Sequence, residues 1–185
     1  MKETVSFPAV MKSVTAISFS AAAVLAILDH FLHPDWLLPA AITAGTTFYH
    51  FAMRLFVGAV VPNFIKQPRN RKWFYPKNFE KNLYTALKVK RWKDHWPTYN
   101  PASFSLRSHA PEQILHTSCV SEAVHEVIIL LSFIPLLFSL RWGAFPVFLI
   151  TSVLAAVFDC SFVIIQRYNR PRLLRILAKK EASAP

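Results

Sequence analysis

Four long apolar runs are the strongest constraint on how this chain can fold. They cover residues 13–31, 37–64, 116–140 and 144–165, and each is long enough to cross a bilayer as a helix. Only 17% of the residues are charged, against about 25% in soluble domains. A helix satisfies its own backbone hydrogen bonds in lipid. We therefore predict an all-α, polytopic membrane protein with four transmembrane helices, forming a single domain over residues 1–185.

The basic residues gather between and after the apolar runs, and this sets the expected orientation. The net charge is +11. The positive-inside rule places the loop 65–115, the tail 166–185 and both termini in the cytoplasm. No nucleic-acid-binding motif is evident, so the positive charge predicts anionic lipid headgroups as partners, and no nucleic acid. We expect a multi-pass protein of the cell membrane. Ala21–Ala23 resembles a signal-peptide cleavage site, but we favour an uncleaved first helix because the apolar run is long.

The cytoplasmic loop contains one amphipathic stretch. Phe79, Leu83 and Leu87 recur at four-residue spacing among lysines, which predicts a helix over residues 78–91 on the membrane surface. Its basic face either docks an anionic lipid or an acyl donor, or is simply solvated. Behind it, Trp92 suits the headgroup layer and Asp94 can exchange protons. Trp92, Lys93 and Asp94 are therefore loop candidates, with structural hydrogen bonding as the alternative.

Ionisable residues occur several residues away from either end in three of the apolar runs. Such groups are costly in a membrane and usually face a bundle interior or a wet cavity. Residues three or four apart share a helical face. Counting residues from the cytoplasmic end of each run gives the depth of each ionisable group, and all of them fall about 9–15 Å deep in the inner leaflet or one turn beyond. We therefore predict one catalytic cluster made of His50, Arg54, Glu122, His125, Glu126 and Asp159.

This cluster has the groups needed for acyl transfer to an alcohol. His125 would be the general base, Glu122 and Glu126 would orient it, and Arg54 would bind a carbonyl or phosphate oxygen. Two alternatives remain open. The charges, with Asp159, can form a purely structural ion network in a non-catalytic adaptor or carrier. Glu122-x-x-His125 also has the spacing of carboxylate-bridged di-iron sites, although a second such motif is missing. This second alternative is a metal-dependent lipid-modifying enzyme, whereas the acyltransferase hypothesis has no metal and no cofactor.

A basic segment follows the last apolar run. Arginine forks bind phosphate well, and the amide residues among them are not needed for a simple basic cap. The segment therefore predicts a site for the phosphate of a coenzyme A or carrier-protein donor, or for a lipid headgroup; the alternative is a cap that ends the span. The residues are Gln166, Arg167, Asn169, Arg170 and Arg172.

Three motifs carry a resemblance to a known family. They are KVKRWKDHWP (Lys88–Pro97), SEAVHE (Ser121–Glu126) and IIQRYNRPRL (Ile164–Leu173). Over most of Tyr49–Leu174 the chain resembles the small integral-membrane glycosyl-4,4'-diaponeurosporenoate acyltransferases of carotenoid biosynthesis. The resemblance implies transfer of a fatty acyl group from an acyl-CoA or acyl-carrier-protein donor to a sugar hydroxyl of a membrane glycolipid. It assigns no catalytic residues, so the roles above rest on depth and spacing alone.

Overall fold

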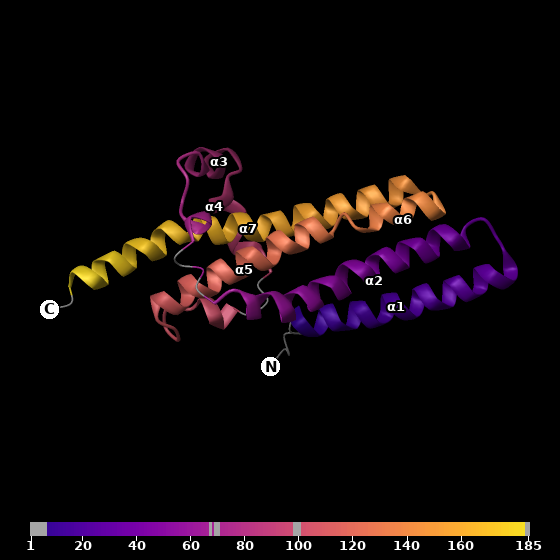
Figure 1. The fold of residues 1–185 in the computed structure, drawn as a ribbon, viewed down its shortest axis with the longest axis horizontal. Helices are drawn as coiled ribbons and strands as arrows, with labels where there is room; N and C mark the ends of the chain where they lie inside the picture. The colour runs from indigo at the N-terminus through magenta and orange to yellow at the C-terminus, as the bar shows by residue number, and fades with distance from the viewer. Residues whose placement is uncertain (1–6, 67, 69–70, 98–100, 184–185) are drawn as a thin grey trace. The chain divides into compact units, whose positions relative to one another are not determined.

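The structure is a computed structural model that describes residues 7–66, 68, 71–97 and 101–183. Helices account for most of it (Figure 1). No β-strand occurs in these ranges, so the prediction of an all-helical chain is confirmed there. The helices, in chain order, are α1 (Phe7–Leu32), α2 (Leu37–Val60), α3 (Glu80–Ala86), α4 (Val89–Trp92), α5 (Pro111–Leu131), α6 (Pro135–Trp142) and α7 (Phe145–Ala182).

Three stretches are long and apolar enough to cross a membrane. They are Phe7–Leu32, Pro111–Trp142 and Phe145–Ala182, and they contain the first, third and fourth predicted runs. The second run is helical as expected, but α2 is not among the three. Its threonines and its two ionisable residues, His50 and Arg54, lower its apolar character.

The contacts divide the chain into two units, which we describe separately. The first unit comprises Met1–Ala59 and Val127–Asp159, and the second comprises Val60–Glu126 and Cys160–Pro185. The single domain predicted from the sequence stays a prediction.

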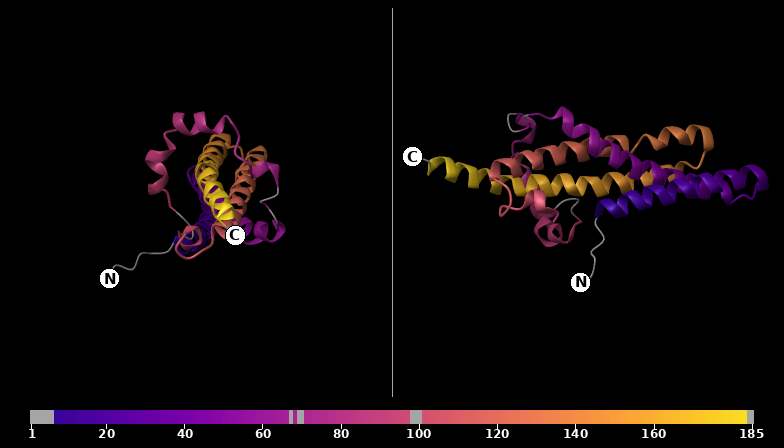
Figure 2. Two further views of the ribbon diagram at one scale, coloured as in Figure 1. Left: turned by 90° about the vertical axis from the view of Figure 1, so that its left-hand side faces the viewer. Right: turned by 90° about the horizontal axis from the view of Figure 1, so that it is seen from below.

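In the first unit, α1 and α2 run antiparallel and side by side (Figures 1 and 2). The rings of Phe19 and Phe48 meet between them, with centroids 5.1 Å apart. Many large apolar side chains of this unit remain exposed, for example Leu130 at 74% and Leu140 at 88%. Water-soluble proteins rarely expose so much apolar surface. This exposure agrees with helices that have lipid as their solvent.

Pro135 interrupts the third apolar run. Proline has no N–H to offer the carbonyl four residues earlier, which belongs to Leu131. α5 ends at Leu131, and the Ile134 N–H donates to the Leu131 carbonyl at 3.1 Å. The hydroxyl of Tyr49, on α2, donates to the same oxygen at 2.8 Å. A side chain of α2 thus satisfies the backbone group that the proline break leaves underused.

We expect Tyr49→Phe to lower the free energy of unfolding by about 0.5–1.5 kcal/mol, the usual net contribution of one hydrogen bond. In a Pro135→Ala background the loss should be smaller, because the alanine N–H can then bind the Leu131 carbonyl. Denaturant unfolding of the four purified proteins in detergent checks this. An equal loss in both backgrounds would show that Tyr49 does not act through the proline break.

In the second unit, the helix of the fourth run continues well beyond the predicted span. α7 passes through Pro171 and ends at Ala182, although the apolar run ends at Ile165. The reason is packing: Leu177 joins a buried cluster with Phe74, Leu115 and Cys119, and the partly buried Leu174 packs against it. Such tertiary contacts, more than propensity, stabilise helices in proteins.

The predicted continuous helix over residues 78–91 is wrong. The stretch forms two short helices, α3 and α4, separated at Lys88, which has a left-handed backbone with φ of 50°. This conformation costs a non-glycine residue about 1–2 kcal/mol. The next residue, Val89, is 0% exposed, and burying a valine contributes about 1.5–3 kcal/mol. Burial of Val89 therefore offsets the unfavourable turn.

Candidate functional site

Two arginines and two glutamates form a buried ion network in the second unit. Glu122, on α5, is 0% exposed. Its Oε1 lies 2.7 Å from Nε of Arg167, and its Oε2 lies 2.5 Å from Nη2 of Arg170; both arginines are on α7. Arg167 also donates from Nη1 to Oε1 of Glu80 at 2.6 Å. Two positive and two negative charges balance, which is what permits their burial.

The same arginines hold the segment that precedes α3. Arg167 donates from Nη2 to the carbonyl of Trp73 at 3.0 Å, and Arg170 donates from Nη1 to the carbonyl of Phe74 at 3.0 Å. Each guanidinium also lies 5.5 Å from the ring centroid of the residue whose carbonyl it binds. A planar guanidinium with five donors in a fixed fork can bind a carboxylate and a carbonyl together while its face stacks on an aromatic ring. The network thus ties α5, α7, α3 and the 73–74 segment together.

Tyr84 extends the network. Its hydroxyl donates to Oε2 of Glu80 at 2.9 Å, and its ring meets that of Tyr168 at 5.5 Å. Burial, and then the neighbouring Glu80 carboxylate, raise the pKa of Tyr84, so the hydroxyl keeps the proton it donates. The sequence pattern did not indicate a role for Glu80, Tyr84 or Trp73. The available signal was that Glu80 is one of few acidic residues in a basic loop, with a tyrosine four positions on.

His125 lies within an aromatic group. Its ring stacks on that of Phe162, with centroids 4.5 Å apart and planes 5° from parallel. Phe162 in turn meets the ring of Trp96 at 6.2 Å. The neighbouring Glu126 accepts hydrogen bonds from Nε1 of Trp73 at 2.9 and 3.0 Å. An indole is neutral, so this contact places no positive charge beside Glu126, which lies in the same turn of α5 as His125.

The first unit holds a separate charged pair. Arg54 forms an ion pair with Asp159, which is 1% exposed, and its Nη2 donates to the carbonyl of Ala155 at 3.2 Å. Its Nη1 donates to the carbonyl of His50 at 2.9 Å. The His50 side chain is buried, and neither of its ring nitrogens has a hydrogen-bond partner among the described residues.

The predicted catalytic cluster is therefore distributed over the two units. His50, Arg54 and Asp159 belong to the first, and Glu122, His125 and Glu126 to the second. Each carboxylate that we expected to orient His125 has another partner: guanidinium groups for Glu122 and an indole for Glu126. The catalytic role of these six residues stays a prediction.

The five residues of the predicted donor site all belong to the second unit, where they divide between two places. Arg167 and Arg170 bind carboxylates within the network. The other three, Gln166, Asn169 and Arg172, line a cavity of about 180 Å³ together with Ser118 and apolar side chains.

The loop candidates lie near the surface and make local contacts. Nζ of Lys93 lies 2.6 Å from Oδ1 of Asp94, and this hydrogen bond lowers the pKa of Asp94. Nε1 of Trp92 donates to the carbonyl of Leu87 at 3.0 Å. In the part of the chain that the structure describes, no three His, Cys, Asp or Glu side chains gather as metal ligands would.

A comparison with protein families places these contacts in a known context. The sequence model of the glycosyl-4,4'-diaponeurosporenoate acyltransferases matches residues 70–179, more than half of the chain. The match includes the whole ion network and His125, and it excludes Arg54. No curated protein and no solved structure matches the chain.

Proposed function

This chain belongs to the glycosyl-4,4'-diaponeurosporenoate acyltransferase family, and on that premise we propose that it is a membrane acyltransferase. It transfers a fatty acyl group to a hydroxyl of a membrane glycolipid or glycosylated isoprenoid at the cytoplasmic leaflet. One observation carries the proposal: contacts join the three sequence motifs in the second unit. Trp96 of the first motif meets Phe162, which stacks on His125 of the second; Glu122 of the second pairs with Arg167 of the third.

The proposed topology has four spans, with α2 as the second, and both termini in the cytoplasm. α2 has 24 residues, or about 36 Å of helix, enough for a hydrocarbon core of about 30 Å. Pairing of Arg54 with Asp159 lowers the cost of placing Arg54 in lipid. The basic loop, including α3 and α4, then lies on the inner side, where anionic headgroups attract it.

The proposed mechanism uses His125 as the general base. It takes the proton of the acceptor hydroxyl while the hydroxyl oxygen attacks the carbonyl carbon of an acyl thioester. The C–S bond then breaks, and the leaving thiolate takes the proton back from the imidazolium. Glu126 stabilises the imidazolium by its negative charge. Glu122 is a positioning residue, because its bonds to Arg167 and Arg170 hold α7 against α5.

The cavity lined by Gln166, Asn169 and Arg172 suits the acceptor. Amide and guanidinium groups pair well with sugar hydroxyls, and Leu173 and Ile176 in its wall suit an apolar chain. The donor in this proposal is an acyl-CoA or an acyl carrier protein.

The test is lipid analysis of membranes that contain wild type, His125→Ala or His116→Ala. Loss of a general base typically costs about 10²–10⁴-fold, so we expect at least about a hundredfold less acylated glycolipid from His125→Ala. His116 is the matched control, because it is an exposed histidine on the same helix, and its variant should act like wild type. Equal product from all three proteins would remove His125 from the mechanism.

A second candidate function is a non-catalytic membrane adaptor or carrier. The charge balance among Glu80, Glu122, Arg167 and Arg170 favours it, because a fully paired network needs no substrate to justify its burial. This candidate predicts that membranes with and without the protein contain the same amount of acylated glycolipid. The same lipid analysis tests this by comparing wild type with an empty-vector control.

A further inference from the structure

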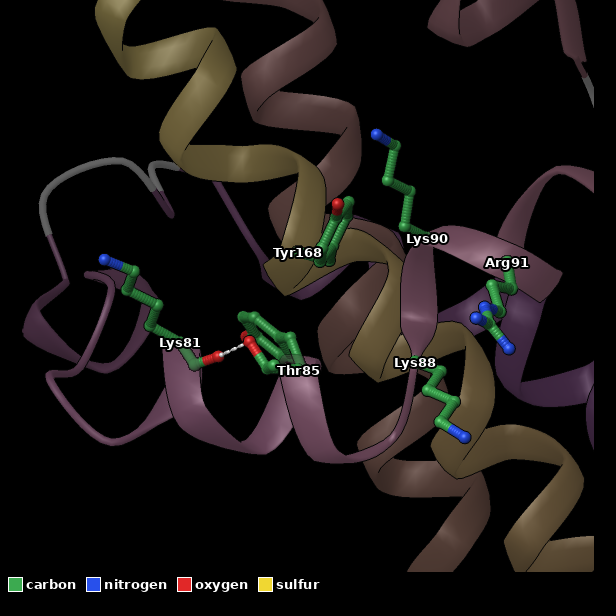
Figure 3. A pocket seen from close by; sticks show the side chains of 7 residues that line it. Lys81, Thr85, Lys88, Lys90, Arg91 and Tyr168 are labelled. Carbon is green, nitrogen blue, oxygen red and sulfur yellow. Dashed lines mark hydrogen bonds between the residues drawn. The ribbon is translucent and has the colours of Figure 1, made fainter.

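The second unit contains a larger cavity, of about 440 Å³, between the α3–α4 region and α7 (Figure 3). We propose that it binds the phosphate groups of the acyl donor, a soluble thioester with several phosphates such as a coenzyme A ester. This inference rests on the proposed acyltransferase function. It also answers a question that the ion network raises: Arg167 and Arg170 are committed to carboxylates, so other cations have to receive the donor.

The charges around the cavity are all of one sign. Four basic residues line it, Lys81, Lys88, Lys90 and Arg91, and no acidic residue does. None of the four forms an ion pair among the described residues, whereas Arg54, Lys93, Arg167, Arg170 and Lys180 all have a carboxylate partner. Like charges gathered without a counterion repel one another and attract anions. A ligand with several phosphates supplies the missing negative charge.

The break between α3 and α4 brings these cations together. Successive residues of an α-helix are about 100° apart, so an unbroken helix would place Lys90 about 180° from Lys81. Because Lys88 adopts φ of 50°, the chain turns, and Lys90 and Arg91 line the same cavity as Lys81. In Figure 3, Tyr168 of α7 lies between Lys81 on one side and Lys90 and Arg91 on the other. An unfavourable backbone conformation in a non-glycine residue often marks a functional site.

The cavity is large enough for more than a single phosphate, and part of its wall is held in place by hydrogen bonds. Its volume lies within the range of about 300–1,000 Å³ typical of small-molecule sites. The rings of Tyr84 and Tyr168 form part of its wall and offer flat surfaces for the organic part of a donor. Tyr84 is fixed through Glu80 to Arg167, and Arg167 to Glu122, three residues from His125 on α5.

The two sides of α3 favour a soluble ligand over a lipid headgroup. Leu83 and Leu87 lie on the side opposite Lys81 and Thr85 and remain exposed, as does Phe79. If this apolar row rests on the bilayer, the cationic side of α3 faces water.

The test measures binding of coenzyme A to the purified full-length protein by calorimetry, in nanodiscs of neutral lipid. We expect Lys90→Ala/Arg91→Ala to weaken binding about tenfold or more, because each lost charge-assisted hydrogen bond is worth at least that factor. The matched control is Arg71→Ala/Lys72→Ala, which removes the same two charges from exposed positions in the same loop and should bind like wild type.

Four results would overturn the proposal. Equal weakening by both variants would indicate general attraction by net charge, and unchanged binding in both would exclude the cavity. If Lys90→Ala/Arg91→Ala weakened only the binding of anionic lipid, the cavity would be a site for a lipid headgroup. If it weakened only the binding of an acyl carrier protein, the cavity would be a site for a protein. Binding does not need turnover. If the protein acylates glycolipid but its binding of coenzyme A does not depend on the cavity, only this inference is wrong. If coenzyme A binds through the cavity but no glycolipid is acylated, the proposed function is wrong.

Discussion

Glu122→Ala is expected to lower the free energy of unfolding by about 3–5 kcal/mol, the usual cost of removing one partner from a buried ion pair. The variant leaves Arg167 and Arg170 with one carboxylate, Glu80, for two guanidinium groups. Arg170 is 2% exposed, so water cannot replace the lost partner without opening the packing between α5 and α7. The free energy of unfolding of Glu122→Gln should lie between those of wild type and Glu122→Ala, because the amide keeps the shape of the side chain and one acceptor but not the charge.

The matched control for this prediction is Glu112→Ala. Glu112 is on the same helix and pairs with Lys180 at 3.0 Å, but the side chains are 40% and 60% exposed, respectively. Exposed ion pairs are worth about 0–1 kcal/mol, so this variant should unfold almost like wild type. Denaturant unfolding in detergent compares the proteins. If Glu122→Ala is no less stable than Glu112→Ala, the network does not support the fold.

Arg54→Ala should be destabilising by a similar amount, about 3–5 kcal/mol, because it removes the cation beside a buried carboxylate. Asp159 is 1% exposed, and the arginine also satisfies the carbonyls of His50 and Ala155. The double variant Arg54→Met/Asp159→Leu removes both charges together. Buried pairs replaced by apolar residues are often neutral or more stable, so we expect the double variant to recover most of the loss.

Arg141→Ala is the control in the same unit, because Arg141 is exposed, and its stability should stay close to wild type. The measurement is again unfolding in detergent, arranged as a double-mutant cycle. If the loss in the double variant equals the sum of the losses in its two single variants, the two residues act independently, and the pair is not what makes Arg54 necessary.

The positions of the helices were predictable because long apolar runs leave a chain few alternatives in lipid. Pro135 ended α5 where proline chemistry requires it. Of the predicted cluster, His50, Glu122 and Asp159 are buried, and Arg54 pairs with Asp159. The end of α7 was not predictable from hydropathy, because the contacts of Leu174 and Leu177 that extend it involve Phe74 and Leu115, far away in sequence.

The partners of the charged groups were harder to predict than their existence. Sequence depth indicates that Glu122 needs a counterion, but it cannot distinguish Arg54 from Arg167, because both are basic residues in or near apolar runs. The turn at Lys88 had no signal either, since neither glycine nor proline stands there. Its cause is the burial of Val89, a tertiary effect.

The pairing of Glu122 with Arg167 and Arg170 has a consequence for biogenesis. A chain is made from its N-terminus, so α5 emerges from the ribosome well before the end of α7 exists. During that interval the carboxylate has neither guanidinium beside it, and insertion of an acidic side chain near the middle of a helix is penalised by about 2.5–3.5 kcal/mol. The ion pairs with Arg167 and Arg170 can offset this penalty only after translation has passed Arg170, so we expect membrane integration of the third apolar run to become more favourable once the fourth has been made.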